Sequence, residues 1–253
     1  MHFAGSIKVD ESITNPLKYY DNNTEGSRVL IEAAVKENVE TFVFSSTAAV
    51  YGFVAGDGQV SEEALTEPLN PYGWSKLQTE CLLKDVSEAN GLRFGILRYF
   101  NVAGADAKGR HGQFIEGPTH LIGRTIDAVR GAAGKLQIFG NNLPTKDGTG
   151  VRDYLHVCDL ADAHVAVLSY LQATQKSETF NLGYGVGHSV LDVVGCVEVL
   201  AGKPVPYEFV PAREGEAPAV VADVSKLQKQ IGWQPAYADI SKIVQSALDW
   251  AGR

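Results

Sequence analysis

Short apolar runs and longer amphipathic stretches alternate along the first part of the chain. Positions 41–46 and 93–99 are mostly apolar and of strand length, so each predicts a short buried strand. Asn15 with Pro16, and later Pro71, begin stretches of helical length, because proline is favoured at the first helical position. We expect these helices to end near residues 37 and 90. Strand, helix and strand in this order are typical of parallel βαβ units.

Beyond Asn101 the alternation becomes less regular, but further elements are still predicted. We expect helices at about 119–132, 159–171, 189–201, 224–231 and 239–251, strands at 136–139, 179–182 and 207–210, and loops at 53–69, 103–117 and 141–151. The predicted fold class is therefore α/β. Ligands of such sheets bind beyond the carboxyl ends of the strands. Thr47, Phe100 and Asn101 each follow a predicted strand and are expected at that rim.

Composition narrows the class of protein. With 45% apolar and 21% charged residues, the chain resembles an ordinary soluble globular protein. The net charge of −8 argues against nucleic acid as a partner. No apolar run approaches the ~20 residues that span a membrane, and residues 1–5 show no signal-peptide pattern. Cys81, Cys158 and Cys196 are odd in number and widely spaced, which favours reduced thiols in a cytoplasmic protein.

No metal site is predicted. The histidines form no short pair with the spacing of metal ligands. His156 and His164 are separated by a segment that contains Asp159 and Asp162, which we interpret as the start of a helix with capping side chains.

Tyr72 and Lys76 are the first candidates for chemistry. If the helix that begins at Pro71 forms, residues four apart share a face, and the two side chains lie next to each other. A nearby cation favours the phenolate, so a phenol with an ordinary pKa of about 10 can serve as a base near neutrality. The pair alone is a weak signal, because most such pairs lie on a solvated helix surface, so its context decides.

The context is similar to that of UDP-glucose 4-epimerases, a family of the extended short-chain dehydrogenase/reductase superfamily. A strand that ends in Ser45-Ser46-Thr47 precedes the Tyr-x-x-x-Lys pattern by about 25 residues. Further blocks resemble the family in the same order and spacing: His2-Phe3-Ala4-Gly5, Tyr20-Asp21-Asn22-Asn23, Leu97-Arg98-Tyr99-Phe100-Asn101, 147–157, 159–161, Phe180-Asn181-Leu182-Gly183 and Arg213-Glu214-Gly215. The resemblance extends over the whole chain, and 147–161 is its most specific part.

The chain departs from the family at its beginning. Members of the family open with a strand and a Gly-x-x-Gly-x-x-Gly turn for the NAD pyrophosphate, and by comparison about 75 residues are absent here. The glycines at 183, 185 and 187 resemble a later family loop, not this turn. The resemblance therefore implies that the 253 residues alone lack normal turnover.

The resemblance implies a Rossmann-like parallel sheet, N-terminally truncated, with a smaller mixed α/β substrate domain. We expect residues 1–103 and the returning segment 153–183 to form the remainder of the NAD-binding domain. Residues 104–152 and 184–253 are expected to bind the UDP sugar. In the family reaction a tyrosine takes the proton of the sugar 4-hydroxyl, the C4 hydride passes to bound NAD, and the 4-keto sugar turns over before the hydride returns.

The resemblance also assigns roles to residues of this sequence. Tyr72 is the implied base, Lys76 lowers its pKa and holds the nicotinamide ribose, and Thr47 binds the reacting oxygen, or alternatively only a local amide. The implied cofactor-binding residues are Phe3, Ala4, Gly5, Asn22, Thr47, Tyr72, Lys76 and Phe100. The implied substrate-binding residues are Asn101, His120, Gln137, Ile138, Phe139, Arg152, Arg213, Glu216 and Val220. The two arginines suit a diphosphate because a guanidinium meets phosphate oxygens bidentately, although ion pairs with Asp153 or Glu214 are the alternative.

The implied activity is interconversion of UDP-glucose and UDP-galactose. Dehydratases of the same superfamily need an acidic pair just after the threonine, where this chain has Ala48 and Ala49, and alanine cannot donate a proton. The alternatives left open are a 4-epimerase for another UDP sugar (N-acetylated, pentose or uronic acid) and an inactive UDP-sugar-binding protein. Members of the family are often homodimers, so a homodimer is also expected.

Overall fold

A three-stranded parallel sheet forms the centre of one half of the molecule in this computed structural model, which describes residues 1–54, 58–114, 117–212 and 217–253. Its strands are β1 (Thr41–Ser45), β3 (Arg93–Tyr99) and β7 (Glu178–Leu182), in the spatial order β1-β3-β7. In the register, Ser45 lies opposite Leu97, and Leu97 lies opposite Phe180. His2 adds one parallel bridge to Phe44 at the β1 edge.

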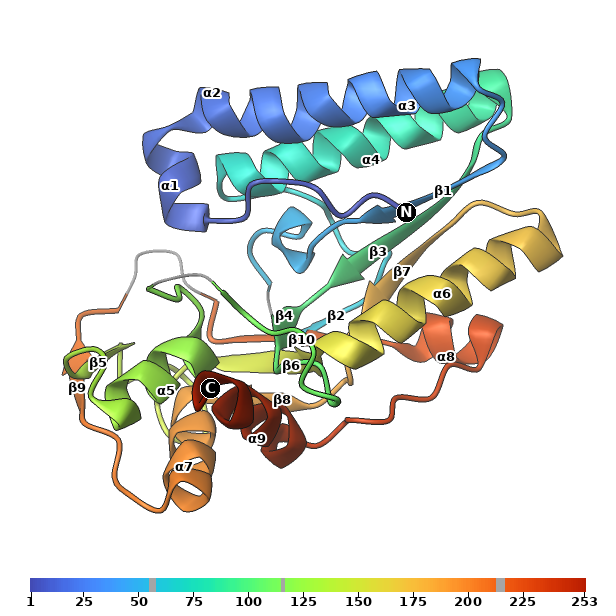
Figure 1. Ribbon diagram of the computed structural model, residues 1–253. Coiled ribbons are helices and arrows are strands. Elements are labelled where there is room, and N and C mark those ends of the chain that lie inside the picture. The colour runs from blue at the N-terminus through green and yellow to red at the C-terminus, as the bar shows by residue number, and fades with distance from the viewer. Residues whose placement is uncertain (55–57, 115–116, 213–216) are drawn as a thin grey trace.

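Helices cover both faces of this sheet (Figure 1). On one face lie α3 (Gly26–Lys36) and α4 (Pro71–Asn90), which bury Phe44, Phe94 and Ile96. On the other face lies α6 (Val157–Thr174), which packs against Val43, Leu97 and Phe180. Alternate residues of each strand therefore enter different cores, as the two-residue period of a strand requires.

The helix α4 carries the Tyr72 and Lys76 pair, and its ends are encoded locally. The Asn70 side chain accepts a hydrogen bond from the Gly73 amide at 2.9 Å, and Pro71 occupies the first turn. Gly91 ends the helix with a φ of 75°, a left-handed conformation that favours glycine. The start and the end were both predicted from the sequence.

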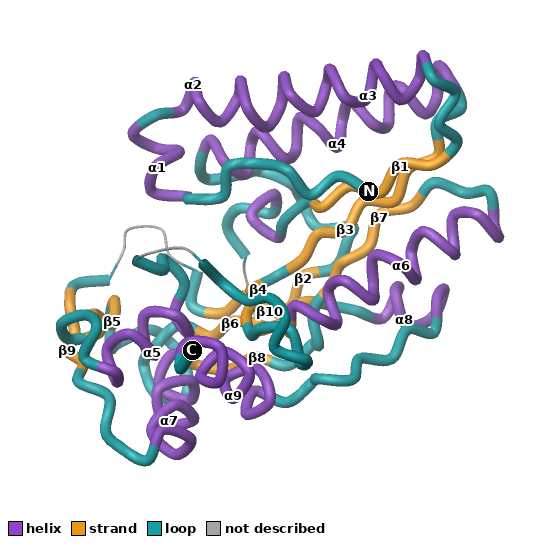
Figure 2. The backbone as a smooth tube through the Cα atoms, viewed as in Figure 1, coloured by secondary structure: helices purple, strands orange, loops and turns teal. Residues whose placement is uncertain are grey.

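The other half of the molecule contains shorter strands (Figure 2). One sheet has the order β2-β10-β6-β4, with β8 antiparallel to β6, and a separate parallel pair joins β5 to β9. The bounds of these strands are β2 Gln59–Val60, β4 Asn101–Ala103, β5 Leu136–Phe139, β6 Val151–His156, β8 Gly187–Ser189, β9 Tyr207–Val210 and β10 Ala219–Ala222. The first of these sheets thus joins segments from both sides of the expected domain boundary at residue 103.

Three helices pack together in this second half. They are α5 (Leu121–Arg130), α7 (Val190–Ala201) and α9 (Ile240–Ala251), and they share a core with Leu136, Ile138 and Tyr154. The remaining described helices are α1 Val9–Thr14, α2 Pro16–Tyr19, the π-helix Tyr20–Glu25, the 3₁₀ turn Ala48–Val50 and α8 Ser225–Ile231. No helix among the described residues is both long and apolar enough to cross a membrane.

The structure corrects several predictions. Residues 9–14 form a helix that was not predicted, and the continuous helix expected at 16–37 contains the π-helical turn Tyr20–Glu25. Strand β6 was also missed, because the loop prediction ran to residue 151 and Arg152 and Asp153 interrupt its apolar pattern. Asp153 is nevertheless buried, because its carboxylate accepts hydrogen bonds from the backbone amides of Tyr184, Gly185 and Ala222.

Candidate active site

The carboxyl end of β1 meets the first turns of α4. The Lys76 ammonium donates a hydrogen bond to the Ser45 carbonyl oxygen at 3.0 Å and lies 4.9 Å from the centre of the Phe44 ring. Two residues further along the strand, the Thr47 hydroxyl forms a hydrogen bond with the Tyr72 phenol. The structure therefore brings the three expected catalytic side chains together at the rim of the sheet.

Burial governs the electrostatics of this pair. Tyr72 and Lys76 are 6% and 2% exposed. Desolvation lowers the pKa of Lys76 to about 8. Desolvation also raises the pKa of Tyr72, and the nearby Tyr99 raises it further, which outweighs the hydrogen bond from Thr47. The expectation that the pKa of Tyr72 lies below its ordinary value is therefore wrong for this chain.

Thr47 has both of the partners considered from the sequence. Its hydroxyl accepts a hydrogen bond from the Ala49 amide at 3.2 Å, which caps the 3₁₀ turn Ala48–Val50. It also contacts Tyr72, and the residue is buried. A hydroxyl fixed by a local amide and directed at a phenol is well placed to orient a reacting oxygen.

The N-terminal segment lies against Lys76. A Cβ atom on Gly5 would lie 3.3 Å from the Lys76 nitrogen and 3.2 Å from Asn23 Oδ1, so glycine permits this close approach. Asn23 fixes the segment, because its side chain accepts from the Ser6 amide at 2.7 Å and donates to the Ser6 carbonyl at 3.0 Å. The sequence assigned a role to the neighbouring Asn22, which is exposed, and missed Asn23, although the Asn-Asn pair was visible.

The expected cofactor residues Phe3 and Ala4 are exposed beside this segment. The ring of Phe3 lies 4.8 Å from that of His164. Gly5 thus lies between the exposed residues Phe3 and Ala4 and the buried amine of Lys76, which is a hydrogen-bond donor beside this segment. The described residues contain no cluster of histidine, cysteine, aspartate or glutamate able to hold a metal ion.

Phe100 and Val220 belong to one apolar cluster next to the site. Phe100 is 6% exposed, and the partly buried Val220 packs against the cluster that contains it, together with Leu77 of α4. Asn101 follows Phe100, begins β4 and is exposed. The structure thus places these three expected residues along the same rim as Thr47.

Arg152 lies in β6 opposite Val220 of β10. Its guanidinium donates to the Val151 carbonyl at 2.8 Å and to the Pro218 carbonyl at 3.4 Å. The alternative of an ion pair with Asp153 is not favoured by the hydrogen bonds of that carboxylate, which go to backbone amides. Arg213, Glu214 and Glu216 lie outside the described residues.

The remaining expected substrate residues lie in other elements. Gln137, Ile138 and Phe139 belong to β5, where Gln137 is exposed and Ile138 is buried. His120 caps α5, accepts from the Gly123 amide and contacts Gln113. It lines a cavity of about 360 Å³ between α5 and α9, so the structure does not bring His120 into contact with Tyr72.

Sequence reasoning also missed a buried ion pair behind the site. Glu80, one turn beyond Lys76, is fully buried and binds Arg98 of β3 through both carboxylate oxygens, with distances of 2.6 to 3.2 Å. Glu80 also accepts a hydrogen bond from the Ser46 hydroxyl. Its position four residues after Lys76, on the same helix face, was the available signal.

The chain is similar to known proteins over nearly its whole length. The chain is 49% identical over 250 residues to UDP-glucose 4-epimerase from Azospirillum brasilense, across 99% of this chain and 72% of that protein. The structure of UDP-glucose 4-epimerase from Brucella ovis in complex with NAD matches with a TM-score of 0.95, 38% identity, and 98% of this chain and 76% of that chain covered. The UDP-Glc/GlcNAc 4-epimerase from Campylobacter jejuni matches with a TM-score of 0.86 and 44% identity, covering 99% of this chain and 76% of that chain. Residues 1–183 match the NAD dependent epimerase/dehydratase family, and the chain belongs to that family.

Proposed function

We propose that this protein is an isomerase that interconverts UDP-glucose and UDP-galactose with bound NAD. The observation that carries the proposal is the contact of the Tyr72 phenol with the Thr47 hydroxyl, with the buried ammonium of Lys76 one helical turn away. Epimerisation is favoured over dehydration, because the residues after Thr47 are Ala48 and Ala49 and offer no acid for a leaving hydroxide.

The residues of this chain have distinct roles in the proposed reaction. Thr47 orients the sugar 4-hydroxyl, and Tyr72 takes and later returns the proton at that oxygen. Burial raises the pKa of Tyr72, which favours the protonated phenol, the form that donates to a 4-keto oxygen. The cation of Lys76 favours the phenolate in the opposite step. NAD, when bound, supplies the hydride acceptor for C4, and Lys76, Gly5 and Phe3 would hold its nicotinamide half.

We further propose that Arg152 and Arg213 bind the diphosphate, that His120, Gln137 and Phe139 contribute to the nucleotide site, and that Val220 lies beside the sugar. Valine leaves more room than a larger side chain would, and the Campylobacter jejuni relative is described as a UDP-Glc/GlcNAc enzyme. These two observations favour UDP-N-acetylglucosamine as a second candidate substrate.

The test is a conversion assay with purified protein, UDP-galactose and excess NAD, with UDP binding measured in parallel by calorimetry. NAD is added in excess so that the assay does not depend on the cofactor that remains bound during purification. Formation of UDP-glucose that is lost in Tyr72→Phe supports the proposal. UDP binding without any conversion would instead support the alternative of a UDP-sugar-binding protein without turnover.

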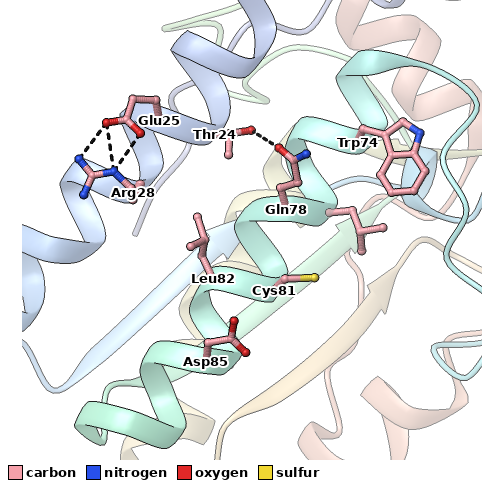
Figure 3. Close-up of a pocket in the computed structure, with 9 residues that line it drawn as sticks. Thr24, Glu25, Arg28, Trp74, Gln78, Cys81, Leu82 and Asp85 are labelled. Carbon is pink, nitrogen blue, oxygen red and sulfur yellow. Dashed lines mark hydrogen bonds and ion pairs between the residues drawn. The ribbon is translucent and has the colours of Figure 1, made fainter.

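We also infer that two copies of the chain associate through α3 and α4. Between these helices lies a groove of about 420 Å³, whose walls include Trp74, Leu82 and Cys81 (Figure 3). Trp74 is 40% exposed, and the Arg28 side chain, paired with Glu25, forms a polar rim. A two-fold interface brings one patch against its own copy, and an apolar centre with both charges at its rim suits that pairing.

Light scattering tests this association. Wild type is expected to have the mass of a dimer, and Leu82→Lys, which places a charge in the groove, is expected to be monomeric. Val199→Lys is the matched control, because Val199 is 80% exposed on α7, away from the groove. Monomeric wild type would refute the inference.

The three cysteines, all unpaired, support a reducing compartment, and we propose the cytoplasm.

A further inference from the structure

Glu80 and Arg98 form a buried ion pair that the proposed reaction does not use. Their side chains are 0% and 4% exposed, and the guanidinium reaches both carboxylate oxygens. A buried ion pair is a weak source of stability, because the desolvation of two charges offsets most of their attraction. Apolar side chains of similar volume would stabilise the core at least as well. Stability therefore does not explain the pair, and its other contacts indicate a role.

The carboxylate of Glu80 completes a regular set of contacts between α4 and the end of β1. Three residues spaced four apart on one helix face bind three consecutive residues of the strand end. Lys76 binds the carbonyl of Ser45, Glu80 binds the hydroxyl of Ser46, and Tyr72 binds the hydroxyl of Thr47. The contact in the middle of the strand end is thus the one made by Glu80.

Arg98 holds this carboxylate in place from the neighbouring strand. The Ser46 amide donates to the Leu97 carbonyl at 2.8 Å, so the strand end and β3 are tied together directly beside the pair. The guanidinium also donates to the Tyr51 hydroxyl at 3.1 Å and lies 5.0 Å from its ring. Residues on both sides of Thr47 are therefore fixed to one buried group.

We propose that Glu80, held by Arg98, is a positioning residue for the reaction inferred above: through Ser46 it sets the place of Thr47 relative to Tyr72. The proposal rests on the epimerase function only for its kinetic readout. Ser46 and Thr47 are adjacent, so a shift of the strand end displaces the Thr47 hydroxyl. A displacement of about 1 Å at a reacting group is enough to lower a rate by about 100-fold.

Ser46→Ala is the main test, because it removes one hydroxyl and leaves the ion pair intact. We expect kcat to fall about 10-fold or more, with KM for UDP-glucose within about threefold of wild type. Ser12→Ala is the matched control: Ser12 is equally buried, and among the described residues its hydroxyl donates to the Val9 carbonyl, at 2.6 Å. Both variants should unfold at similar urea concentrations, and the control should keep the wild-type kcat.

Hydrogen exchange gives a readout that does not depend on turnover. The amides of Val50 and Tyr51 bind the carbonyls of Thr47 and Ala48 in the 3₁₀ turn. They should exchange faster in Ser46→Ala than in wild type or in Ser12→Ala. If wild type proves inactive but this exchange still increases, the proposed function fails and the positioning role stands.

The double variant Glu80→Leu with Arg98→Met removes the pair without leaving a single buried charge. This double variant should fold, and its kcat should fall by about as much as that of Ser46→Ala. Adding Ser46→Ala to the double variant should not lower kcat further, because both changes remove the same contact. If it does not fold, Ser46→Ala alone decides. A kcat and an exchange rate in Ser46→Ala that both stay within about twofold of wild type would overturn the proposal.

Discussion

Replacing Lys76 by methionine should stabilise the folded protein. The ammonium of Lys76 is 2% exposed, and its described hydrogen bond is the one to the neutral Ser45 carbonyl. Burial of the charge lowers its pKa to about 8, which means that the folded state binds this proton more weakly than the unfolded state does. Methionine has a similar length, carries no charge and suits an irregular apolar site.

The size of the gain follows from the pKa. A decrease from 10.5 to about 8 corresponds to about 3 kcal/mol of destabilisation at neutral pH. The carbonyl of Ser45 loses its partner in the variant, which costs about 1 kcal/mol. We therefore expect Lys76→Met to increase the free energy of unfolding by about 2 kcal/mol near neutrality.

The pH dependence of this gain has a defined sign. The penalty is complete below the folded pKa of about 8 and disappears as the pH rises toward the unfolded value of 10.5. Urea unfolding, followed by tryptophan fluorescence, should show a gain that shrinks by about 2 kcal/mol between about pH 7 and about pH 9.5. Lys84→Met is the control, because Lys84 is exposed on the same helix. A variant less stable than wild type near neutrality, or a gain independent of pH, would refute the reasoning.

Three further outcomes are expected. Tyr72→Phe should lower kcat by about 10²–10⁴-fold while UDP affinity in calorimetry is retained; a rate within about threefold of wild type would remove Tyr72 from the chemistry. Val220→Tyr should lower kcat/KM for UDP-N-acetylglucosamine and spare UDP-glucose, because a ring beside the sugar excludes the larger substituent; unchanged selectivity would mean that another side chain closes the pocket. Asp153→Asn should lower the free energy of unfolding by about 1–3 kcal/mol, because an amide nitrogen cannot accept from the backbone amides that the carboxylate binds; urea midpoints equal to wild type would contradict this.

Elements whose ends are encoded by neighbouring residues were predictable from the sequence. Strand β3 was predicted with its observed bounds, and α4 has a cap at Asn70, a proline in its first turn and a left-handed Gly91. Strand β6 was not predictable in the same way. Its pairing with β10 and β4 joins residues more than 50 positions apart, and its charged residues are tolerated only through contacts made after folding.

The candidate site shows the same division. Tyr72, Lys76 and Thr47 were found because one helical spacing and one strand end carry the signal. Glu80 and Ser46 were missed, because their contact depends on how α4 lies against β1, which no local pattern specifies. The direction of the pKa of Tyr72 was also wrong, because burial of the phenol in the folded chain raises it.

The two buried cations beside the strand end have different surroundings, and this difference fits their proposed roles. The charge of Arg98 is balanced by Glu80, so it is fixed in place and suited to holding geometry. In the described part of the chain no carboxylate pairs with Lys76, so burial of its charge destabilises the fold. The buried charge of Lys76 lowers the stability of the fold at the candidate site. One turn further along the same helix face, the ion pair of Glu80 and Arg98 fixes the position of the strand end through Ser46.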